Sequence, residues 1–566
     1  MAPILYRHFS VSDTSLVKTI GIAAPLKSGH WRLLDALGEV FGVRLEERPF
    51  GSDAGLDAWI RHEGDSEIRR RRAHSDCPSY TIIPDDQLVP CGMSSTIEFG
   101  RHSALPAVLS GRRVEAAEAS KLQSLPLNLR NDIVVLASKG GAPFWAMQEV
   151  DGRQHHYVAS PLPELNEGEP LFRYFHGREF LQLLPLILFL RNLTEDKRWE
   201  QPPLQACFMF DDPNLHWRTY GFVDFAEIAM HAERHRYHVS FATIPLDTWF
   251  VHKSTSVIFQ QQRDQLSLLI HGNDHIAEEF ARPYLAEELD TKLWQALRRI
   301  GEFERRSGVE VARVMAPPHG ACSESTLRAM AQLGFEAACV SRGSLHHYNK
   351  EATWVRTLGM RPSEMIGGGP VLLRFPLKRS CHNSILIAAL LHQPVIAVGH
   401  HHDVAEGLHL LSDLAGFIDS IGTVRWGNMR QICRGHYARR LDGKSLSIRM
   451  FTKRVEVCIP DGINELWVEE PRLRVAQSAP FLWRLLGERS GWNPHLPDAP
   501  ITVRPLQRLE IVSEFPTSPV IDAMKGNGLR LWPMVRRQIT EVRDRISPVL
   551  RRATGFAAKA KIDRGA

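Results

Sequence analysis

One stretch of the sequence reads Leu268-Leu269-Ile270-His271-Gly272-Asn273-Asp274-His275. An apolar run, typical of a buried strand, ends here in two histidines four positions apart. Three other apolar runs also end in polar side chains, and these endings are Asp211-Asp212, Pro317-Pro318-His319 and His400-His401-His402-Asp403. In a parallel β/α barrel the catalytic residues lie at the carboxyl ends of the strands. The four segments therefore predict a β/α barrel whose strand ends carry the chemistry.

Two imidazoles and one carboxylate form the ligand set of a zinc site with an open coordination position. If a helical turn begins at His271, its ring and that of His275 project from one face. One carboxylate of the Asp211-Asp212 pair would bind the metal, and the other would accept a proton from the attacking water. His400 or His402 would donate a proton to the leaving group.

Each segment taken singly has a simpler interpretation. An Asp-Asp pair after an apolar run is often a turn or a helix cap, and two histidines four apart are often surface residues. The order of the segments, each at the end of a predicted strand, favours a joint site over these separate interpretations.

The four segments resemble the motifs of the polysaccharide deacetylase family, the NodB-homology metal-dependent carbohydrate esterases. The family patterns T-F-D-D-G, H-[ST]-x-x-H, R-P-P-Y-G and L-x-H-D have counterparts at positions 209–213, 271–275, 316–320 and 398–403. The resemblance extends over residues 204–425. It implies a deacetylase-type (β/α)7 barrel and a divalent metal, with zinc as the first choice.

The resemblance also implies a role for each matching residue. Asp211 would be the general base, and Asp212, His271 and His275 would bind the metal. The late histidine would be the general acid. Positions 398, 400 and 402 share one face of an extended strand, which favours His400, and then His402, over His401.

The chain departs from the family pattern at Pro213, which replaces a glycine, and at Ala316, which replaces an arginine. The usual charge partner of the base aspartate is therefore missing from the third motif. Arg374, at the end of a later predicted strand, could supply that charge, although a surface arginine at a strand end is an equal interpretation. Pro318 and His319, which takes the tyrosine position, are the remaining candidates for substrate binding.

A chain of 566 residues is too long for one core, so we expect several domains in an α/β protein. Strands and helices alternate in the region that resembles the deacetylases, whereas apolar residues recur with period two after it. The expected parts are an N-terminal α/β domain (1–200, flavodoxin- or amidotransferase-like, without an evident active site), the barrel (204–425), a small C-terminal β-sandwich (427–520) and a basic helical tail (521–566).

The charge of the chain is concentrated at its end. The net charge is +5, but residues 536–566 contain nine Lys or Arg and three Asp or Glu, so the remainder is close to neutral. A neutral body argues against a nucleic-acid partner, and we expect at most weak contact of the tail with an anionic membrane. The N-terminus has no charged segment followed by an apolar core, which predicts a cytoplasmic protein.

The strand-end residues predict a metal-dependent hydrolase, and the resemblance implies that it removes N-acetyl groups from an amino-sugar substrate, such as a polysaccharide, a glycolipid or a glycan precursor. Two alternatives stay open: an amidohydrolase acting on a small non-sugar amide, and a non-catalytic scaffold that binds glycan. Metal content separates the scaffold from the enzymes, and release of acetate separates the two enzymes.

Overall fold

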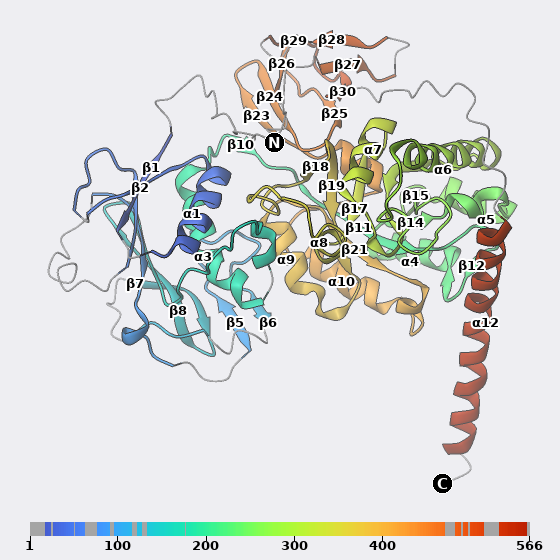
Figure 1. The fold of residues 1–566 in the computed structure, drawn as a ribbon, viewed down its shortest axis with the longest axis horizontal. Helices are drawn as coiled ribbons and strands as arrows, with labels where there is room; N and C mark the ends of the chain where they lie inside the picture. Colours follow the sequence, from blue (N-terminus) through green and yellow to red (C-terminus); the bar gives the residue numbers. More distant parts are fainter. Residues whose placement is uncertain are drawn as a thin grey trace. The chain divides into compact units, whose positions relative to one another are not determined.

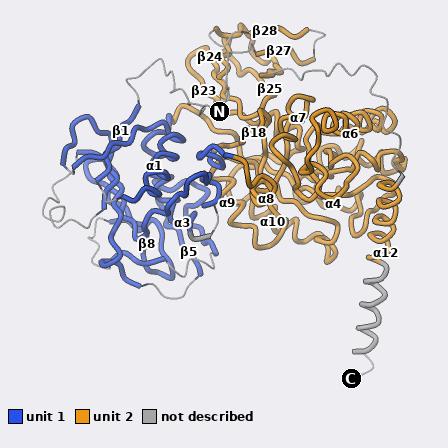
Figure 2. The backbone as a smooth tube through the Cα atoms, in the orientation of Figure 1, with its two compact units in different colours: residues 1–196, 353–360 blue, residues 197–352, 361–566 orange. Residues whose placement is uncertain are grey.

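The computed structural model describes residues 17–23, 26–49, 51–62, 76–90, 95–115, 122–126, 133–175, 177–469, 481–487, 491–495, 499–513 and 531–562. The chain divides into two compact units (Figure 2). The first unit comprises residues 1–196 and 353–360, and the second comprises residues 197–352 and 361–566.

The first unit is built on a mixed sheet in the order β2-β1-β3-β4-β9-β8-β7-β5-β6. Its strands are β1 (Thr19–Ala23), β2 (Arg44–Glu47), β3 (Ala58–His62), β4 (Ser79–Ile82), β5 (Thr96–Phe99), β6 (Arg113–Glu115), β7 (Ile133–Lys139), β8 (Ala142–Val150) and β9 (Arg153–Val158). Neighbours run parallel from β2 to β9 and antiparallel from β9 to β6. Helices α1 (Ser28–Phe41) and α3 (Gly177–Thr194) contact each other in this unit (Figure 1).

The hairpin β8–β9 turns at Asp151 and Gly152, whose φ angles are 50° and 75°. Two successive left-handed residues match the right-handed twist of the strands that they join, which is why Asp-Gly favours this turn. A later segment also belongs to this unit: the N–H groups of Leu171 and Phe172 donate to the carbonyls of Arg356 and Leu358, each at 2.9 Å. In the sequence, that segment falls within the range 204–425 expected for the barrel.

The second unit contains a mostly parallel sheet in the order β18-β19-β17-β16-β15-β14-β11-β21-β20, with β22 beside β11. The strands are β11 (Leu204–Asp211), β14 (Val239–Thr243), β15 (Leu266–Ile270), β16 (Val311–Met315), β17 (Ala337–Val340), β18 (Glu364–Ile366), β19 (Gly369–Leu373), β20 (Phe375–Pro376), β21 (Val395–Gly399) and β22 (Val424–Trp426). The architecture is therefore mixed α/β. Strand pairing among the described residues follows an open path, so closure into a seven-stranded barrel stays a prediction.

Both faces of this sheet are buried, which explains the unbroken apolar runs in the sequence. Cys207 and Met209 of β11 belong to an apolar cluster with residues of the neighbouring strands. Phe208, which points to the other face, packs its ring against Tyr237 at 5.1 Å. Alternate side chains of β11 therefore enter two different buried clusters, one on each face of the sheet, rather than a core and the solvent.

Helices follow most of these strands (Figure 1). They are α4 (Phe225–His235), α5 (Lys253–Gln261), α6 (Ala286–Ser307), α7 (Glu324–Leu333), α8 (Arg342–His347), α9 (His382–Leu390), α10 (His409–Asp419) and α11 (Met429–Arg434). In α6 the buried residues recur every three or four positions, as in Leu289, Leu293, Ala296, Ile300 and Phe303, so one stripe of the helix faces the core. The helix ends at Gly308, whose φ of 64° suits glycine.

The strands after residue 436 form two further sheets, joined by one strand from before the parallel sheet. The first contains β10 (Trp199–Glu200), β23 (Tyr437–Asp442), β24 (Ser445–Met450), β26 (Glu465–Glu469) and β29 (Ile501–Thr502). The second contains β25 (Arg454–Cys458), β27 (Phe481–Leu485), β28 (Asn493–His495) and β30 (Arg508–Val512). Apolar residues of both sheets, such as Ile448 and Ile511, form one buried cluster.

A buried ion cluster links these C-terminal strands to the parallel sheet. Glu510 of β30 is fully buried and lies 2.5 Å from Arg454 and 2.6 Å from Arg484. Arg434 of α11 lies 3.3 Å from Glu510 and 2.6 Å from Glu336, which precedes β17. The arginines therefore compensate buried carboxylates that come from both parts of the unit.

The last described element is α12 (Leu531–Ile562), which contacts β12 (Thr219–Tyr220) and the short 3-10 turn η5 (Pro245–Trp249) (Figure 1). Both contacted elements follow strands of the parallel sheet, β11 and β14, at their carboxyl ends. In the part of the chain that the structure describes, no helix is sufficiently long and apolar to cross a bilayer.

Candidate metal centre

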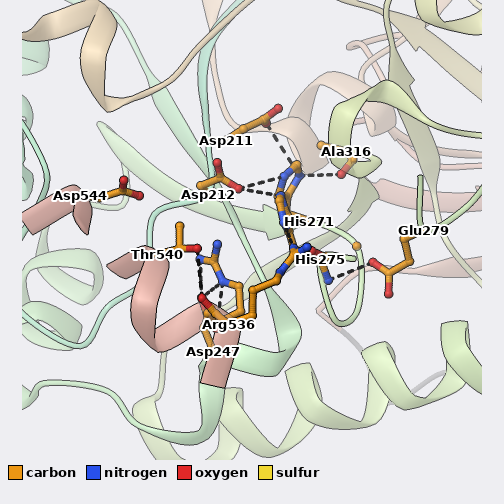
Figure 3. Close-up of polar contacts among 12 residues, drawn as sticks. Asp211, Asp212, Asp247, His271, His275, Glu279, Ala316, Arg536, Thr540 and Asp544 are labelled. Carbon is orange, nitrogen blue, oxygen red and sulfur yellow. Dashed lines mark hydrogen bonds and ion pairs between the residues drawn. The ribbon is translucent and has the colours of Figure 1, made fainter. Parts of the chain in front are cut away.

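The predicted site residues follow parallel strands of one sheet, although these strands are not direct neighbours in it. Asp211 is the last residue of β11, His271 follows β15, and Arg374 follows β19. Because these strands are parallel, their carboxyl ends meet at one edge of the sheet, where Figure 3 shows the side chains of Asp211, Asp212, His271 and His275 pointing toward one another.

Asp212, His271 and His275 converge on a common point. The Oδ1 atom of Asp212 lies 2.9 Å from Nε2 of His275 and 3.4 Å from Nε2 of His271. The three ligand atoms all lie within 4.8 Å of one another. Asp212 adopts the left-handed conformation, with φ of 79°. Its side chain therefore does not continue the alternation of strand β11.

The donor atoms fit a metal cation better than they fit one another. His271 Nδ1 donates to the carbonyl oxygen of Ala316 at 2.7 Å, so a neutral ring directs the lone pair of Nε2 toward Asp212. Asp212 Oδ1 is buried and, despite the short distance to His275, makes no hydrogen bond of acceptable geometry with any residue that the structure describes. A divalent cation would satisfy both the lone pairs and the buried carboxylate oxygen, and the residues present therefore fit a zinc-type site.

Residues 271–275 reach this arrangement as a loop rather than as a helical turn. Gly272 and His275 both have positive φ angles, 69° and 53°. A Cβ on Gly272 would lie 2.5 Å from Cγ of Pro318, so glycine is required for both its conformation and its size. The condition of a helical turn at His271 is not met, yet the two rings lie close together, with their centroids 5.0 Å apart.

A buried carboxylate holds the loop in place. Glu279 is fully buried and accepts three backbone N–H groups, from Asn273 at 3.0 Å, from Asp274 at 2.8 Å and from His275 at 3.1 Å. Burial raises the pKa of Glu279, and the backbone donors of Asn273 and Asp274 act in the opposite direction. Glu279 thus fixes the backbone that carries both histidines (Figure 3).

Asp211 pairs with Arg374 in the interior. Arg374 Nη1 donates to Asp211 Oδ1 at 3.0 Å, and the two side chains are 6% and 5% exposed. The same carboxylate oxygen lies 3.9 Å from Nδ1 of His271. Arg374 therefore provides the guanidinium beside Asp211 that the third motif lacks, since Ala316 stands there in place of an arginine.

The charges of the three converging residues depend on one another. Burial raises the pKa of Asp212, but the facing His271 and His275 lower it more, so its pKa is well below the usual range. Burial lowers the pKa of His271, and Asp211 and Asp212 more than offset this effect. For His275, burial outweighs the attraction of Asp212, and its pKa is lowered. Asp212 therefore remains ionised and available as a ligand.

The third motif borders the site through Pro318 and His319. Pro318 is buried against Gly272, as described above, and His319 is exposed with φ of 57°. The ring centroid of His319 lies 5.3 Å from that of His275. His319 is thus the more accessible of the two to a bound molecule.

The three late histidines do not lie on one strand. β21 ends at Gly399, and residues His401–Val404 form a 3-10 turn, so the alternation used to rank the histidines does not extend beyond Gly399. His400 and His402 are exposed, whereas His401 is buried. His401 Nε2 lies 3.8 Å from Oδ1 of Asp544, and these two residues form a second group of metal-ligand type with His402.

Helix α12 supplies residues to this region that the sequence motifs did not identify. Arg537 lies 2.7 Å from Asp247, and Glu541 lies 2.8 Å from Nδ1 of His216. Arg536 donates to the carbonyl oxygen of His275 (Figure 3). The only local signal in the sequence is that Glu541 and Asp544 are acidic residues within a basic helix, three positions apart.

Comparisons with known proteins give distant structural likenesses. No family model matches the chain, and no curated protein matches it. The solved structure of Agd3, described as a novel carbohydrate deacetylase, is 9% identical, covers 88% of this chain and 99% of its own, and has a TM-score of 0.46. A CE4 esterase of Streptococcus mutans (12% identity, 40% of this chain, 87% of its own, TM-score 0.24) and the polysaccharide deacetylase Bc1974 of Bacillus cereus (13%, 40%, 91%, 0.23) are also similar.

Proposed function

We propose that the chain is a metal-dependent hydrolase that removes N-acetyl groups from an amino-sugar substrate. The observation that carries this proposal is the convergence of Asp212, His271 and His275 beside the buried Asp211–Arg374 pair. The geometry of the site supports metal-dependent hydrolysis, and both the amide bond and the sugar class come from the motif resemblance described above.

Asp212, His271 and His275 would hold the ion, with zinc as the first choice for two imidazoles and a carboxylate. When bound, such an ion polarises an amide carbonyl and makes a water molecule more acidic. Glu279 and Ala316 would orient the two histidines through the hydrogen bonds described above.

Asp211 would accept the proton of the attacking water at a carboxylate oxygen, and the hydrogen bond from Arg374 holds that carboxylate in place. A histidine from the 400–402 turn would return a proton to the nitrogen of the departing amine. His400 and His402 are accessible to substrate, and His401 has a carboxylate, Asp544, at its ring, so each of the three is tested separately below. His319 would contact the substrate at the rim.

The test measures zinc content and acetate release on purified protein, against N-acetylhexosamine oligomers and nucleotide sugars. We expect Asp212→Ala, His271→Ala and His275→Ala to lose zinc and activity together. Asp211→Asn should keep zinc and lose turnover. Among His400→Ala, His401→Ala and His402→Ala, the variant that keeps zinc and loses acetate release identifies the general acid. The matched control is His409→Ala, which replaces an exposed histidine of α10.

Each outcome has a distinct meaning. Zinc in the native protein with acetate released only when Asp211 is intact supports the proposal. Zinc without acetate from any sugar contradicts the deacetylase assignment and leads to other amides. A native protein that binds no divalent metal contradicts the whole proposal.

A further inference from the structure

Helix α12 has an inverted distribution of polar and apolar residues. Among residues 532–548, its buried residues are Pro533 in the first turn and the charged Arg537, Glu541 and Asp544. Five of its large apolar side chains are exposed, beside the polar Gln538 and Arg543, and they are Trp532 (72% exposed), Val535 (47%), Ile539 (62%), Val542 (55%) and Ile546 (46%). A surface helix ordinarily buries its apolar stripe. The outward apolar stripe of α12 therefore indicates a surface that binds another molecule.

The inner contacts fix this orientation. Arg537 pairs with Asp247, Glu541 with His216, and Asp544 accepts a hydrogen bond from Tyr220 at 3.0 Å. Rotating the helix to bury the stripe would break all of these contacts and leave the partner charges buried against apolar side chains. The apolar face consequently stays outward while the helix remains attached to the second unit.

The charges beside the stripe select the kind of occupant. The stripe has the 3-4-3-4 spacing of a coiled-coil seam, and the exposed Arg543 and the partly buried Arg545 flank it. They pair at 2.7 Å with Asp544 and Glu541, which are buried, so the charged groups on the outer side of these pairs are the guanidiniums. A second copy of the helix would thus bring arginines against arginines. Residues 549–562 of the sequence add four basic residues and no acidic one. The face is complementary to an anionic surface.

Exposed aromatic side chains border the helix. The guanidinium carbon of Arg545 lies over the ring of Trp217, 5.6 Å from the ring centroid, and Trp217 is 57% exposed. Trp249 and Phe250, 53% and 43% exposed, pack their rings against His216, which is bound to Glu541 of the helix. Tryptophan is enriched where one side of a side chain meets lipid and the other meets water.

We propose that the outer face of α12 and its neighbouring aromatic residues bind an anionic membrane surface, with the helix lying in the plane of the interface. The stripe would enter the boundary between headgroups and acyl chains, and the arginines would meet the lipid phosphates. The charged inner face would keep its contacts with the second unit. This binding is independent of the reaction proposed above.

The test is flotation of the full-length protein with vesicles of phosphatidylcholine alone or mixed with phosphatidylglycerol. We expect binding to the mixed vesicles that weakens with added salt. The variant Ile539→Gln/Val542→Gln should bind at least about tenfold more weakly, because two apolar side chains no longer enter the interface. Met230→Gln, an exposed apolar residue of α4, is the matched control and should bind as the native protein does. Thermal melts verify that both variants fold.

Three results would overturn the proposal. Binding to mixed vesicles that the double variant retains would place the contact elsewhere. No vesicle binding, with native self-association that the double variant loses in sedimentation velocity, would assign the stripe to a second copy. No vesicle binding, with binding of polyglutamate, would assign the face to an acidic protein.

Discussion

Arg374→Met removes the guanidinium that lies 3.0 Å from Asp211 and leaves a carboxylate in the interior without this partner. The side chain of Asp211 is 5% exposed, so water cannot replace the lost charge without rearrangement of the sheet edge. Removing one partner of a buried ion pair costs about 3–5 kcal/mol of stability, whereas an exposed pair contributes roughly 0–1 kcal/mol. We expect the free energy of unfolding of the second unit to fall by about 3–5 kcal/mol.

The double variant Asp211→Asn/Arg374→Met removes both charges. Its cost should be the lost hydrogen bond and imperfect packing, about 1–3 kcal/mol. The two single changes should therefore be strongly non-additive, with a coupling energy of at least about 2 kcal/mol.

Urea unfolding of the native protein, both single variants and the double variant, in the presence of a chelator, measures this coupling. Arg328→Met on α7 is the control, because Arg328 and Glu324 form an exposed pair at 3.1 Å, and it should cost less than about 1 kcal/mol. Additive costs for Asp211 and Arg374 would refute the reasoning, since they would mean that the two side chains do not compensate each other's charge.

Two further predictions concern the loop and the helix. Glu279→Gln should raise the zinc dissociation constant, measured by competition with a chelator, by roughly 10- to 100-fold, because three backbone donors lose their carboxylate; an unchanged constant would contradict this role. Burial lowers the pKa of His216, but Glu541 and Asp247 together raise it more, so the stabilisation from its positive charge is complete below about pH 6.5 and is lost as the pH rises through the raised value. Trypsin should accordingly cleave α12 faster at about pH 9 than at about pH 6 in the native protein, with a smaller ratio in Glu541→Gln, and equal ratios would exclude the pair as an attachment of the helix.

The sequence predicted the strands of the parallel sheet well and the loops poorly. The apolar runs at 206–210, 266–270, 311–315 and 395–399 all lie in strands, because a strand buried on both faces has a continuous apolar pattern. The conformation of 271–275 could not be predicted in this way. It depends on left-handed residues and on Glu279, and a side chain that accepts backbone donors leaves no periodic signal.

Local sequence patterns could not predict the ion pairs that α12 makes near the site. Arg537 and Asp247 are 290 positions apart, and His216 and Glu541 are 325 apart. An isolated charged residue in the sequence does not indicate its partner, so these pairs require the fold. The apolar stripe, in contrast, is visible as a spacing in the sequence, but only the structure shows that it faces outward.

The short strand β10 has a consequence for how the chain is made. It pairs with β23, and Glu200 meets Arg439 across this pairing, at a separation of 239 residues. During synthesis β10 therefore leaves the ribosome before any strand of the parallel sheet. Its partner β23 is made only after the last strand of that sheet. The C-terminal strands also bring Glu456 and Glu510 to Arg434. A nascent chain that ends before β23 leaves β10 without this partner strand and Arg434 paired with Glu336 alone, so the second unit is complete only when its last sheets have been translated.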